Sequence, residues 1–344
     1  MPEPHAAVPT AVPAADLPPL EDLLAEAHVV ALPMVTKFRG VTLREAFLTR
    51  GPRGWTEFSP FVEYGDREAS AWLTAAIDFG WGDDPEPVRD SVHVNATVPS
   101  VAAGEVASVL ARFPGCRTAK VKVAEPGQQL ADDVARVAAV RDVLGAEGRI
   151  RVDANGLWNV DEAEHAIHAL AACDLEYVEQ PCATVDELAD VRRRVKYMGI
   201  PIAADESVRK AADPLAVARA GAADVLIVKA QPLGGIRSAL EIISLAGLPV
   251  VVSSAIDTSV GLAMGAMLAA SVPRLDLDCG LGTAALLAAD VTRDPLTPAD
   301  GAISVRRVEA DEALLAENAA DADRHAWWIA RVERCYRVLA ESAA

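Results

Sequence analysis

Short apolar segments alternate with alanine-rich amphipathic segments over most of the chain. From about residue 90 the segments rich in β-branched residues are S-V-H-V-N-A, T-A-K-V-K-V, R-I-R-V-D-A-N, L-E-Y-V-E-Q-P, I-P-I-A-A-D-E-S, A-D-V-L-I-V-K-A, L-P-V-V-V-S-S-A and R-L-D-L-D-C-G. Strands that alternate with helices predict right-handed βαβ units and a parallel sheet. Eight such segments favour a closed barrel over an open sheet. No G-x-G-x-x-G follows the first segment, which argues against a dinucleotide-binding sheet.

The two ends of the chain have a different pattern. Residues near 28 to 64 contain short alternating runs and a G-P-R-G turn, so they predict strands, and residues 66 to 80 predict an amphipathic helix with an acidic start. Together they predict a small α+β unit. The last 60 or so residues contain a helix rich in Trp, Arg and Ala, which we expect to pack back against that unit.

Composition and charge narrow the function classes. The 344 residues carry a net charge of −18, which argues against nucleic acid or an anionic membrane as a partner. The longest apolar run, residues 260–273, is too short to span a bilayer, and the start lacks the pattern of a signal peptide. An odd number of scattered cysteines without C-x-x-C predicts free thiols in a reducing cytoplasm. These cysteines are Cys116, Cys173, Cys182, Cys279 and Cys335.

Charged residues recur at or near the carboxyl ends of five predicted strands. They are Lys122, Asp153, Glu179, Asp205 and Lys229. In a barrel these strand ends form one rim, which is where such enzymes build active sites. Three carboxylates in one mouth repel one another unless a cation is present, and an all-oxygen set favours a hard ion such as Mg²⁺ or Mn²⁺.

Lysine placement adds a second signal. Only six of the 32 basic residues are lysine, yet Lys120 and Lys122 lie two residues apart in a strand of valines. The period of a strand points both side chains to one face. A desolvated lysine can lose its proton and act as a base, whereas arginine stays protonated. We therefore expect this face to point inward, with Lys122 nearest the rim.

Each of these residues also has an ordinary structural interpretation. A strand-end acid can cap a helix or pair with a loop cation, D-A-N-G at 153–156 can be a plain turn, and D-E-S at 205–207 can be a cap. Lys120 can extend along apolar surface towards water. The joint placement on successive strands favours a functional site over all of these. No H-E-x-x-H, G-x-S-x-G or P-loop competes with it.

The motifs K-V-K, R-V-D-A-N, V-E-Q-P, A-D-E-S and V-K-A together resemble the enolase superfamily, and within it the muconate-lactonizing subgroup. The resemblance covers about residues 28 to 310. It implies an α/β fold, a modified (β/α)7β TIM barrel with an α+β capping domain formed by the N-terminal segment and the C-terminal tail. It also implies Mg²⁺, for which Mn²⁺ can substitute, with Asp153, Glu179 and Asp205 as ligands. Lys122 and Lys229 match the paired acid/base lysines, Lys120 a supporting cation, and Asn155 a position beside the first ligand.

The expected organisation follows from this resemblance. It comprises a flexible leader at 1–22, the capping domain at 23–90, the barrel at 91–282 and a C-terminal segment at 283–344 that returns to the cap. Composition and motifs carry no signal for an oligomeric state.

Four further segments resemble the actinobacterial o-succinylbenzoate synthase family. They are F-R-G-V-T-L-R-E, G-W-T-E-F-S-P-F, S-S-A-I-D-T-S-V-G-L and C-G-L-G-T. That family dehydrates a small carboxylate, 2-succinyl-6-hydroxy-2,4-cyclohexadiene-1-carboxylate, in menaquinone biosynthesis. The resemblance implies that Lys122 removes the α-proton and that cationic Lys229 stabilises the resulting enediolate. We expect Ser253, Ser254 and Gly280 to touch the substrate, and the cap loop near residues 36–41 to help select it.

Alternatives stay open. Asp276 and Asp278 form a D-x-D that resembles dipeptide epimerases, and an N-succinylamino acid racemase would use the same lysine pair. From other classes, Lys229 could form a Schiff base in a metal-independent barrel, or the chain could be a non-catalytic scaffold. The three carboxylates argue against the first, and the retention of all five charges argues against the second.

Overall fold

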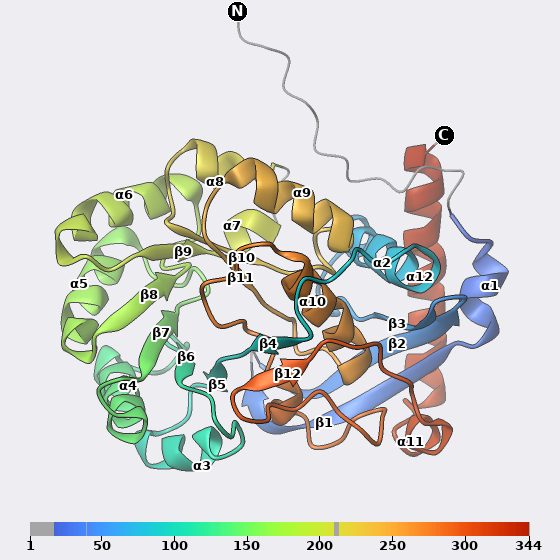
Figure 1. Cartoon of the computed structure of the whole chain (residues 1–344), viewed down its shortest axis with the longest axis horizontal. Helices are drawn as coiled ribbons and strands as arrows, with labels where there is room; N and C mark the ends of the chain where they lie inside the picture. The colour runs from blue at the N-terminus through green and yellow to red at the C-terminus, as the bar shows by residue number, and fades with distance from the viewer. Residues whose placement is uncertain (1–16, 39, 210–212, 344) are drawn as a thin grey trace, which may run out of the picture.

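A seven-stranded parallel sheet curls around the centre of the larger part of the molecule (Figure 1). The computed structural model describes residues 17–38, 40–209 and 213–343. The strands lie in the order β11-β10-β9-β8-β7-β6-β5. Their bounds are β5 Ala96–Val98, β6 Thr118–Lys122, β7 Arg149–Asp153, β8 Leu175–Glu179, β9 Ile202–Ala204, β10 Val225–Val228 and β11 Val250–Val252. The predicted parallel sheet is confirmed.

The two edges of this sheet are joined by a very short eighth segment. Gly280 bridges to Ser253 beside β11, and Cys279 bridges to Val94 just before β5. The prediction of a strand over the whole of residues 274–280 is therefore wrong. The preceding residues lie outside the sheet, and there Arg274 pairs with Asp276 at 2.6 Å on the exposed surface. The modified barrel itself is confirmed.

The first predicted barrel strand is also divided. Its start, β4 (Ser91–His93), pairs antiparallel with β12 (Ala302–Ser304), and only β5 enters the barrel. The single strand predicted over residues 91–96 is thus wrong in extent. Val94 and Asn95 connect the two parts through backbone bonds to Gly301 and Cys279.

Helices cover the outside of the barrel (Figure 1). Local sequence explains where they begin, since Asn159 caps α5 and Thr184 forms a capping box with Glu187 at the start of α6. On α6 the apolar Leu188 and Val191 turn inward at helical spacing. The helices are α3 Val106–Leu110, α4 Leu130–Leu144, α5 Val160–Leu170, α6 Val185–Val195, α7 Glu206–Arg209, α8 Ala216–Arg219, α9 Ile236–Ala246 and α10 Ser259–Ser271.

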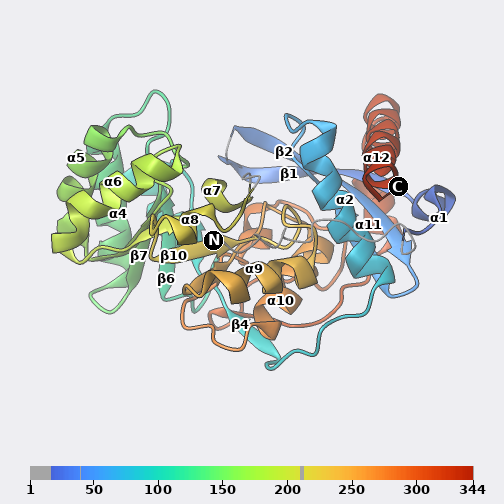
Figure 2. The ribbon, with the colours of Figure 1, turned by 90° about the horizontal axis from the view of Figure 1, so that it is seen from above.

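The N-terminal segment and the C-terminal tail build one cap together (Figure 2). An antiparallel sheet, β1-β2-β3, packs with α2 and the C-terminal helix α12. On α12, Arg331 donates to the carbonyls of Phe61 (3.0 Å) and Tyr64 (2.7 Å), and Trp328 Nε1 donates to Glu45 (2.9 Å). The predicted return of the tail to the N-terminal unit is confirmed. The elements are α1 Leu20–Ala25, β1 His28–Phe38, β2 Val41–Gly51, β3 Gly54–Phe58, α2 Asp66–Trp81, α11 Glu312–Glu317 and α12 Ala322–Ala343.

A buried polar junction fixes the cap to the barrel. Glu57 of β3, with no exposed surface, accepts hydrogen bonds from Thr258 N (3.1 Å), Thr258 Oγ1 (2.6 Å) and Gly261 N (3.1 Å) at the start of α10. A Cβ at Gly261 would approach the Glu57 carboxylate to 2.7 Å, so this close contact requires glycine. Arg44 of β2 donates from Nε to the carbonyl of Ile256 at 3.0 Å. The cap therefore holds the loop that leads from β11 into α10.

The N-terminal residues and the cysteines were the subject of further sequence predictions. The leader predicted at 1–22 lies outside the described residues as far as residue 16, and α1 begins at Leu20, with Leu23 fully buried. The proposed boundaries of the cap and barrel remain a prediction. Within the described residues, no helix has the length and apolar character needed to cross a membrane. All five cysteines are free thiols.

Candidate active site

The five charged residues predicted from their strand positions come together at the carboxyl ends of neighbouring strands. Parallel pairing sets Lys122 opposite Asp153, and Asp153 opposite Glu179. Asp205 follows the last residue of β9, and Lys229 follows the last residue of β10. All three carboxylates are buried, with 2% or less of each residue exposed. Both lysines and two of the carboxylates line one cavity, of about 50 Å³.

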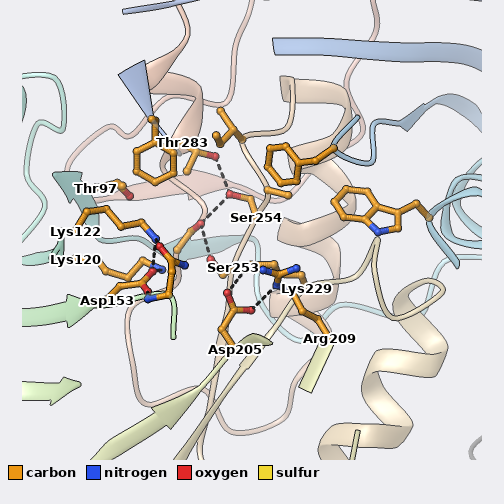
Figure 3. Close-up of a pocket in the computed structure, with 17 residues that line it drawn as sticks. Thr97, Lys120, Lys122, Asp153, Asp205, Arg209, Lys229, Ser253, Ser254 and Thr283 are labelled. Carbon is orange, nitrogen blue, oxygen red and sulfur yellow. Dashed lines mark hydrogen bonds and ion pairs between the residues drawn. The ribbon is translucent and has the colours of Figure 1, made fainter. Parts of the chain in front are cut away.

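Lysines reach this cavity from two sides (Figure 3). Lys120, Lys122 and Asp153 lie on one side, and Lys229 with Asp205 on the other. Lys122 Nζ lies 2.5 Å from Asp153 Oδ2 and 2.6 Å from Asn155 Oδ1. The inward orientation predicted for the K-V-K face is therefore observed, and Lys122 is the lysine nearer the rim.

Lys120 is the more deeply enclosed lysine of the strand. Its ammonium lies 3.0 Å from Asp153 Oδ2 and 2.8 Å from Glu179 Oε1. Burial alone would lower the pKa of Lys120, but these two carboxylates hold it well above the usual value. Burial likewise opposes ionisation of Asp153, yet Lys120 and Lys122 hold its pKa well below the ordinary value. Lys120 is thus a fixed cation.

The Glu179 carboxylate pairs with Lys120 through one of its two oxygens. Burial, followed by the repulsion of Asp153, raises the pKa of Glu179 to about 8 despite Lys120. Its Oε2 atom is buried and has no hydrogen-bond partner among the described residues. A buried carboxylate oxygen without a partner is costly, so this position favours an additional cation.

On the opposite side of the cavity, Asp205 forms ion pairs with two cationic side chains. Lys229 Nζ lies 2.5 Å from Oδ2, and Arg209 Nε lies 3.1 Å from Oδ1. Burial alone would raise the pKa of Asp205, but Lys229 and Arg209 lower it. Burial lowers the pKa of Lys229, and the neighbouring Arg209 and Lys120 add to that effect, while Asp205 opposes it.

The three residues expected to contact a substrate lie in the cavity wall. Ser254 Oγ donates to the carbonyl of Gly280 at 3.0 Å and bonds Thr283 Oγ1 at 2.7 Å. A Cβ at Gly280 would come within 2.5 Å of Ser253 Oγ and 3.1 Å of Ser253 Cβ, so a larger residue there would displace the Ser253 side chain. Contact of Ser253, Ser254 and Gly280 with a substrate remains a prediction.

Sequence reasoning missed several cavity residues. Arg209 follows Asp205 by one helical turn in D-E-S-V-R, and that i, i+4 spacing was a usable signal. Phe61 and Trp72 come from the cap, and no local pattern connects them to the barrel rim. Thr97 on β5 and Thr283 also line the cavity.

A wider groove adjoins the cavity. It has a volume of about 390 Å³ and shares Phe38, Lys122 and Asn155 with the cavity wall. The Lys122 ammonium lies 5.3 Å from the centre of the Phe38 ring, at the boundary of the two spaces. Thr36, Lys37 and Gly40 line the groove, so the predicted cap loop does reach the site. Arg39 of this loop lies outside the described residues.

The D-x-D pair lies away from this cavity. Asp276 is an exposed residue paired with Arg274. The Asp278 carboxylate accepts from Thr118 Oγ1 at 2.5 Å, and Thr118 begins β6 at the end opposite Lys122. Neither aspartate lines the cavity. The two aspartates are therefore not placed to bind a substrate in this cavity, as the dipeptide epimerase alternative requires.

Two family models match the chain. Residues 101–309 match the enolase C-terminal domain-like model, and residues 29–80 match the enolase N-terminal domain-like model. The chain belongs to the enolase superfamily.

Relatives in the superfamily share long stretches of the sequence. The o-succinylbenzoate synthase of Mycobacterium tuberculosis is 55% identical over 327 residues, which cover 95% of this chain and 98% of that one. The o-succinylbenzoate synthase of Mycobacterium leprae is 55% identical over 328 residues, covering 95% and 96%.

Solved structures share the fold. Muconate lactonizing enzyme from Pseudomonas putida has a TM-score of 0.71 at 20% identity, and 2-chloromuconate cycloisomerase from Rhodococcus opacus has 0.73 at 23%. Each match covers 86% of this chain and 98% of the other. The predicted superfamily and the predicted subgroup fold are confirmed.

Members of the superfamily generally use a divalent metal ion. Among the described residues, no group of three His, Cys, Asp or Glu side chains is arranged to hold a metal ion. In this structure lysines pair with the three carboxylates instead. The donor chemistry nevertheless fits one. Asp153, Glu179 and Asp205 are buried oxygen donors at adjacent strand ends, and Glu179 Oε2 has no partner among the described residues.

Proposed function

We propose that this chain is a Mg²⁺-dependent o-succinylbenzoate synthase. It would dehydrate 2-succinyl-6-hydroxy-2,4-cyclohexadiene-1-carboxylate to 2-succinylbenzoate in menaquinone biosynthesis. The observation that carries the proposal is the placement of Lys122 and Lys229 on two sides of one buried cavity that also contains carboxylates. The relatives that bear this name match almost the whole chain at 55% identity.

Lys122 is assigned the proton transfers. As a neutral amine, its Nζ takes the proton from the carbon that bears the substrate carboxylate, and the electron pair of that C–H bond enters the carboxylate as an enediolate. The C–O bond to the ring hydroxyl then breaks as the electrons return and close the aromatic system. The proton on Lys122 leaves with the hydroxyl as water, so no external acid is consumed.

Lys229 is assigned an electrostatic role. Its ammonium, held 2.5 Å from Asp205, faces the cavity from the side opposite Lys122. A fixed cation in a buried site stabilises negative charge that develops on the substrate oxygens. The lysine does not need to move, because the ion pair with Asp205 already fixes its head group.

The proposed ligands of Mg²⁺ are Asp153, Glu179 and Asp205, with Mn²⁺ able to substitute. When bound, the ion would neutralise the carboxylates and bind the substrate carboxylate as a Lewis acid. Lys120 remains a supporting cation beside Asp153 and Glu179. Ser253, Ser254 and Gly280, which line the cavity, are proposed to contact the substrate.

No second function has an observation of its own. The D-x-D of a dipeptide epimerase lies outside the cavity. A metal-independent Schiff-base enzyme has no use for three buried carboxylates at adjacent strand ends, which Asp153, Glu179 and Asp205 provide here. N-succinylamino acid racemization would use the same two lysines, so it enters the test as a competing substrate. The proposed setting is the cytoplasm, in keeping with five free thiols.

The test is an absorbance assay of the purified protein on the cyclohexadiene substrate. Samples contain either Mg²⁺ or EDTA, and parallel samples contain an N-succinylamino acid whose racemization is followed by optical rotation. The proposal predicts aromatic product with Mg²⁺, none with EDTA, and a much larger kcat/KM for dehydration than for racemization. Metal-independent turnover, or racemization as the faster reaction, would contradict it.

A further inference from the structure

Glu206, the residue after Asp205, connects to Lys122 through one intervening amide. Lys122 Nζ donates to Asn155 Oδ1 at 2.6 Å, and Asn155 Nδ2 donates to Glu206 Oε1 at 3.2 Å. Lys122 ends β6, Asn155 follows β7, and Glu206 begins α7 after β9. Three separate strand ends thus meet in one hydrogen-bonded series.

The two ends of the Asn155 amide are chemically different. Its oxygen accepts a hydrogen bond from the Lys122 ammonium, whereas its NH₂ would confront that ammonium with a second donor. Lys122 has only donors, so it favours the oxygen, and an acceptor for the NH₂ group on the other side favours the same orientation. Glu206 Oε1 is that acceptor. Glu206 therefore reinforces the orientation in which Lys122 meets the amide oxygen and holds the amide from the far side.

Glu206 is itself held firmly. Arg209 donates from Nη2 to Glu206 Oε1 at 2.6 Å, and from Nη1 to Tyr64 Oη in the cap at 2.9 Å. Arg209 is buried, and Glu206 retains only 18% of its side-chain exposure. A carboxylate fixed by a buried guanidinium is a rigid reference for the Asn155 amide.

The backbone at Asn155 is also constrained. It adopts a left-handed conformation, φ +48°, and its N–H donates to Asp153 Oδ1 at 3.0 Å. Asparagine tolerates this region better than most residues. The backbone therefore fixes where the amide starts, and the hydrogen bond to Glu206 helps to fix how it is turned.

We propose that Glu206 is a positioning residue for the base, acting on Lys122 through the Asn155 amide. The inference rests on the proposed function, in which Lys122 removes the substrate proton. It assigns Glu206 a role that neither the metal ligands nor the lysine pair include. Small displacements of a reacting group reduce the rate steeply, by about 10²-fold per ångström.

The first test compares Glu206→Ala with Glu206→Gln. Alanine removes the acceptor, and we expect kcat to fall about 10- to 100-fold with KM changed by less than about twofold. Glutamine retains an Oε1 that can accept from both Asn155 and Arg209, so it should restore most of kcat. Glu206→Gln as inactive as Glu206→Ala would overturn the inference, as would an unchanged kcat in Glu206→Ala.

Glu176→Ala is the matched control. Glu176 has 17% side-chain exposure and pairs with Arg151 at 2.5 Å, but it lies near the start of β8, at the other end of the barrel. Its loss should leave kcat within about twofold. Each variant is also melted with and without Mg²⁺. The inference predicts the same metal-induced shift in Glu206→Ala as in wild type, and loss of that shift would place the effect at Asp205 instead.

A double-mutant cycle with Asn155→Gly tests whether Glu206 acts on Lys122 through the Asn155 amide. Glycine removes the amide and accepts the left-handed backbone without strain. If Glu206 acts through Asn155, Glu206→Ala should lower kcat little further in the Asn155→Gly background. Equal losses in both backgrounds would overturn the inference. Wild-type dehydration and its loss in Lys122→Arg judge the proposed function separately, so the two failures are distinguishable.

Discussion

Replacing Glu57 with glutamine should remove a pH-dependent loss of folding stability at the cap–barrel junction. Glu57 has no exposed surface, and burial followed by repulsion from Asp257 raises its pKa from 4.5 to about 7. Because the folded pKa lies above the unfolded one, the folded state binds the proton more tightly. The free energy of unfolding is therefore highest below about pH 4.5 for this group, and it falls as pH rises towards 7.

The magnitude follows from the two pKa values. A rise from 4.5 to about 7 corresponds to about 3 kcal/mol, at about 1.4 kcal/mol per pH unit. About 2 kcal/mol of this is lost between pH 5.5 and pH 8.5, a range that stays above the sequence pI of about 4.7. Glutamine can keep an oxygen towards Thr258 and Gly261 while it removes the charge.

The assay is urea unfolding of wild type and Glu57→Gln across that pH range, with the exposed Glu317→Gln as control. The stability of Glu57→Gln relative to wild type should increase by about 2 kcal/mol from pH 5.5 to pH 8.5, while the control runs parallel to wild type. If the free energies of unfolding of Glu57→Gln and wild type changed equally with pH, the reasoning that burial raises the pKa of Glu57 would be refuted.

Three further predictions concern the site. Lys229→Gln should lower kcat by about 10²- to 10³-fold, because the fixed cation is lost, and steady-state kinetics measure it; a loss below tenfold would contradict the role. Mg²⁺ at 100 times its Kd should stabilise the wild type by about 2.7 kcal/mol in thermal or urea unfolding. Glu179→Gln should reduce this stabilisation, and an equal effect in both proteins would remove Glu179 from the ligands. Asp276→Asn should leave kcat within about twofold, because the Asp276 side chain is 58% exposed; a large loss would revive the D-x-D alternative.

The topology of the fold explains why the charged rim could be predicted from sequence. Successive strands of a parallel barrel place their carboxyl ends at one rim, so Asp153 and Glu179 had to become neighbours once their strands were recognised. The period of a strand likewise put Lys120 and Lys122 on one face. Local pattern and topology were sufficient for these residues.

The remaining features depend on contacts between distant segments. Phe61 and Trp72 reach the cavity from the cap, and the Tyr64 hydroxyl meets Arg209 across 145 residues of sequence. No local periodicity encodes such contacts. The short length of the eighth segment was not predictable from the sequence pattern either. The alternation in R-L-D-L-D-C-G is typical of a strand, yet in the structure Asp276 pairs with Arg274 on the surface.

The central claim is that Lys122 is the base of a dehydration reaction, and Lys122→Arg tests it most directly. Arginine keeps the positive charge beside Asp153 but cannot become a neutral amine at a usable pH. With Mg²⁺ and the cyclohexadiene substrate, the variant should melt close to wild type and form aromatic product at least about 10²-fold more slowly. Turnover near the wild-type rate in this variant would contradict the account.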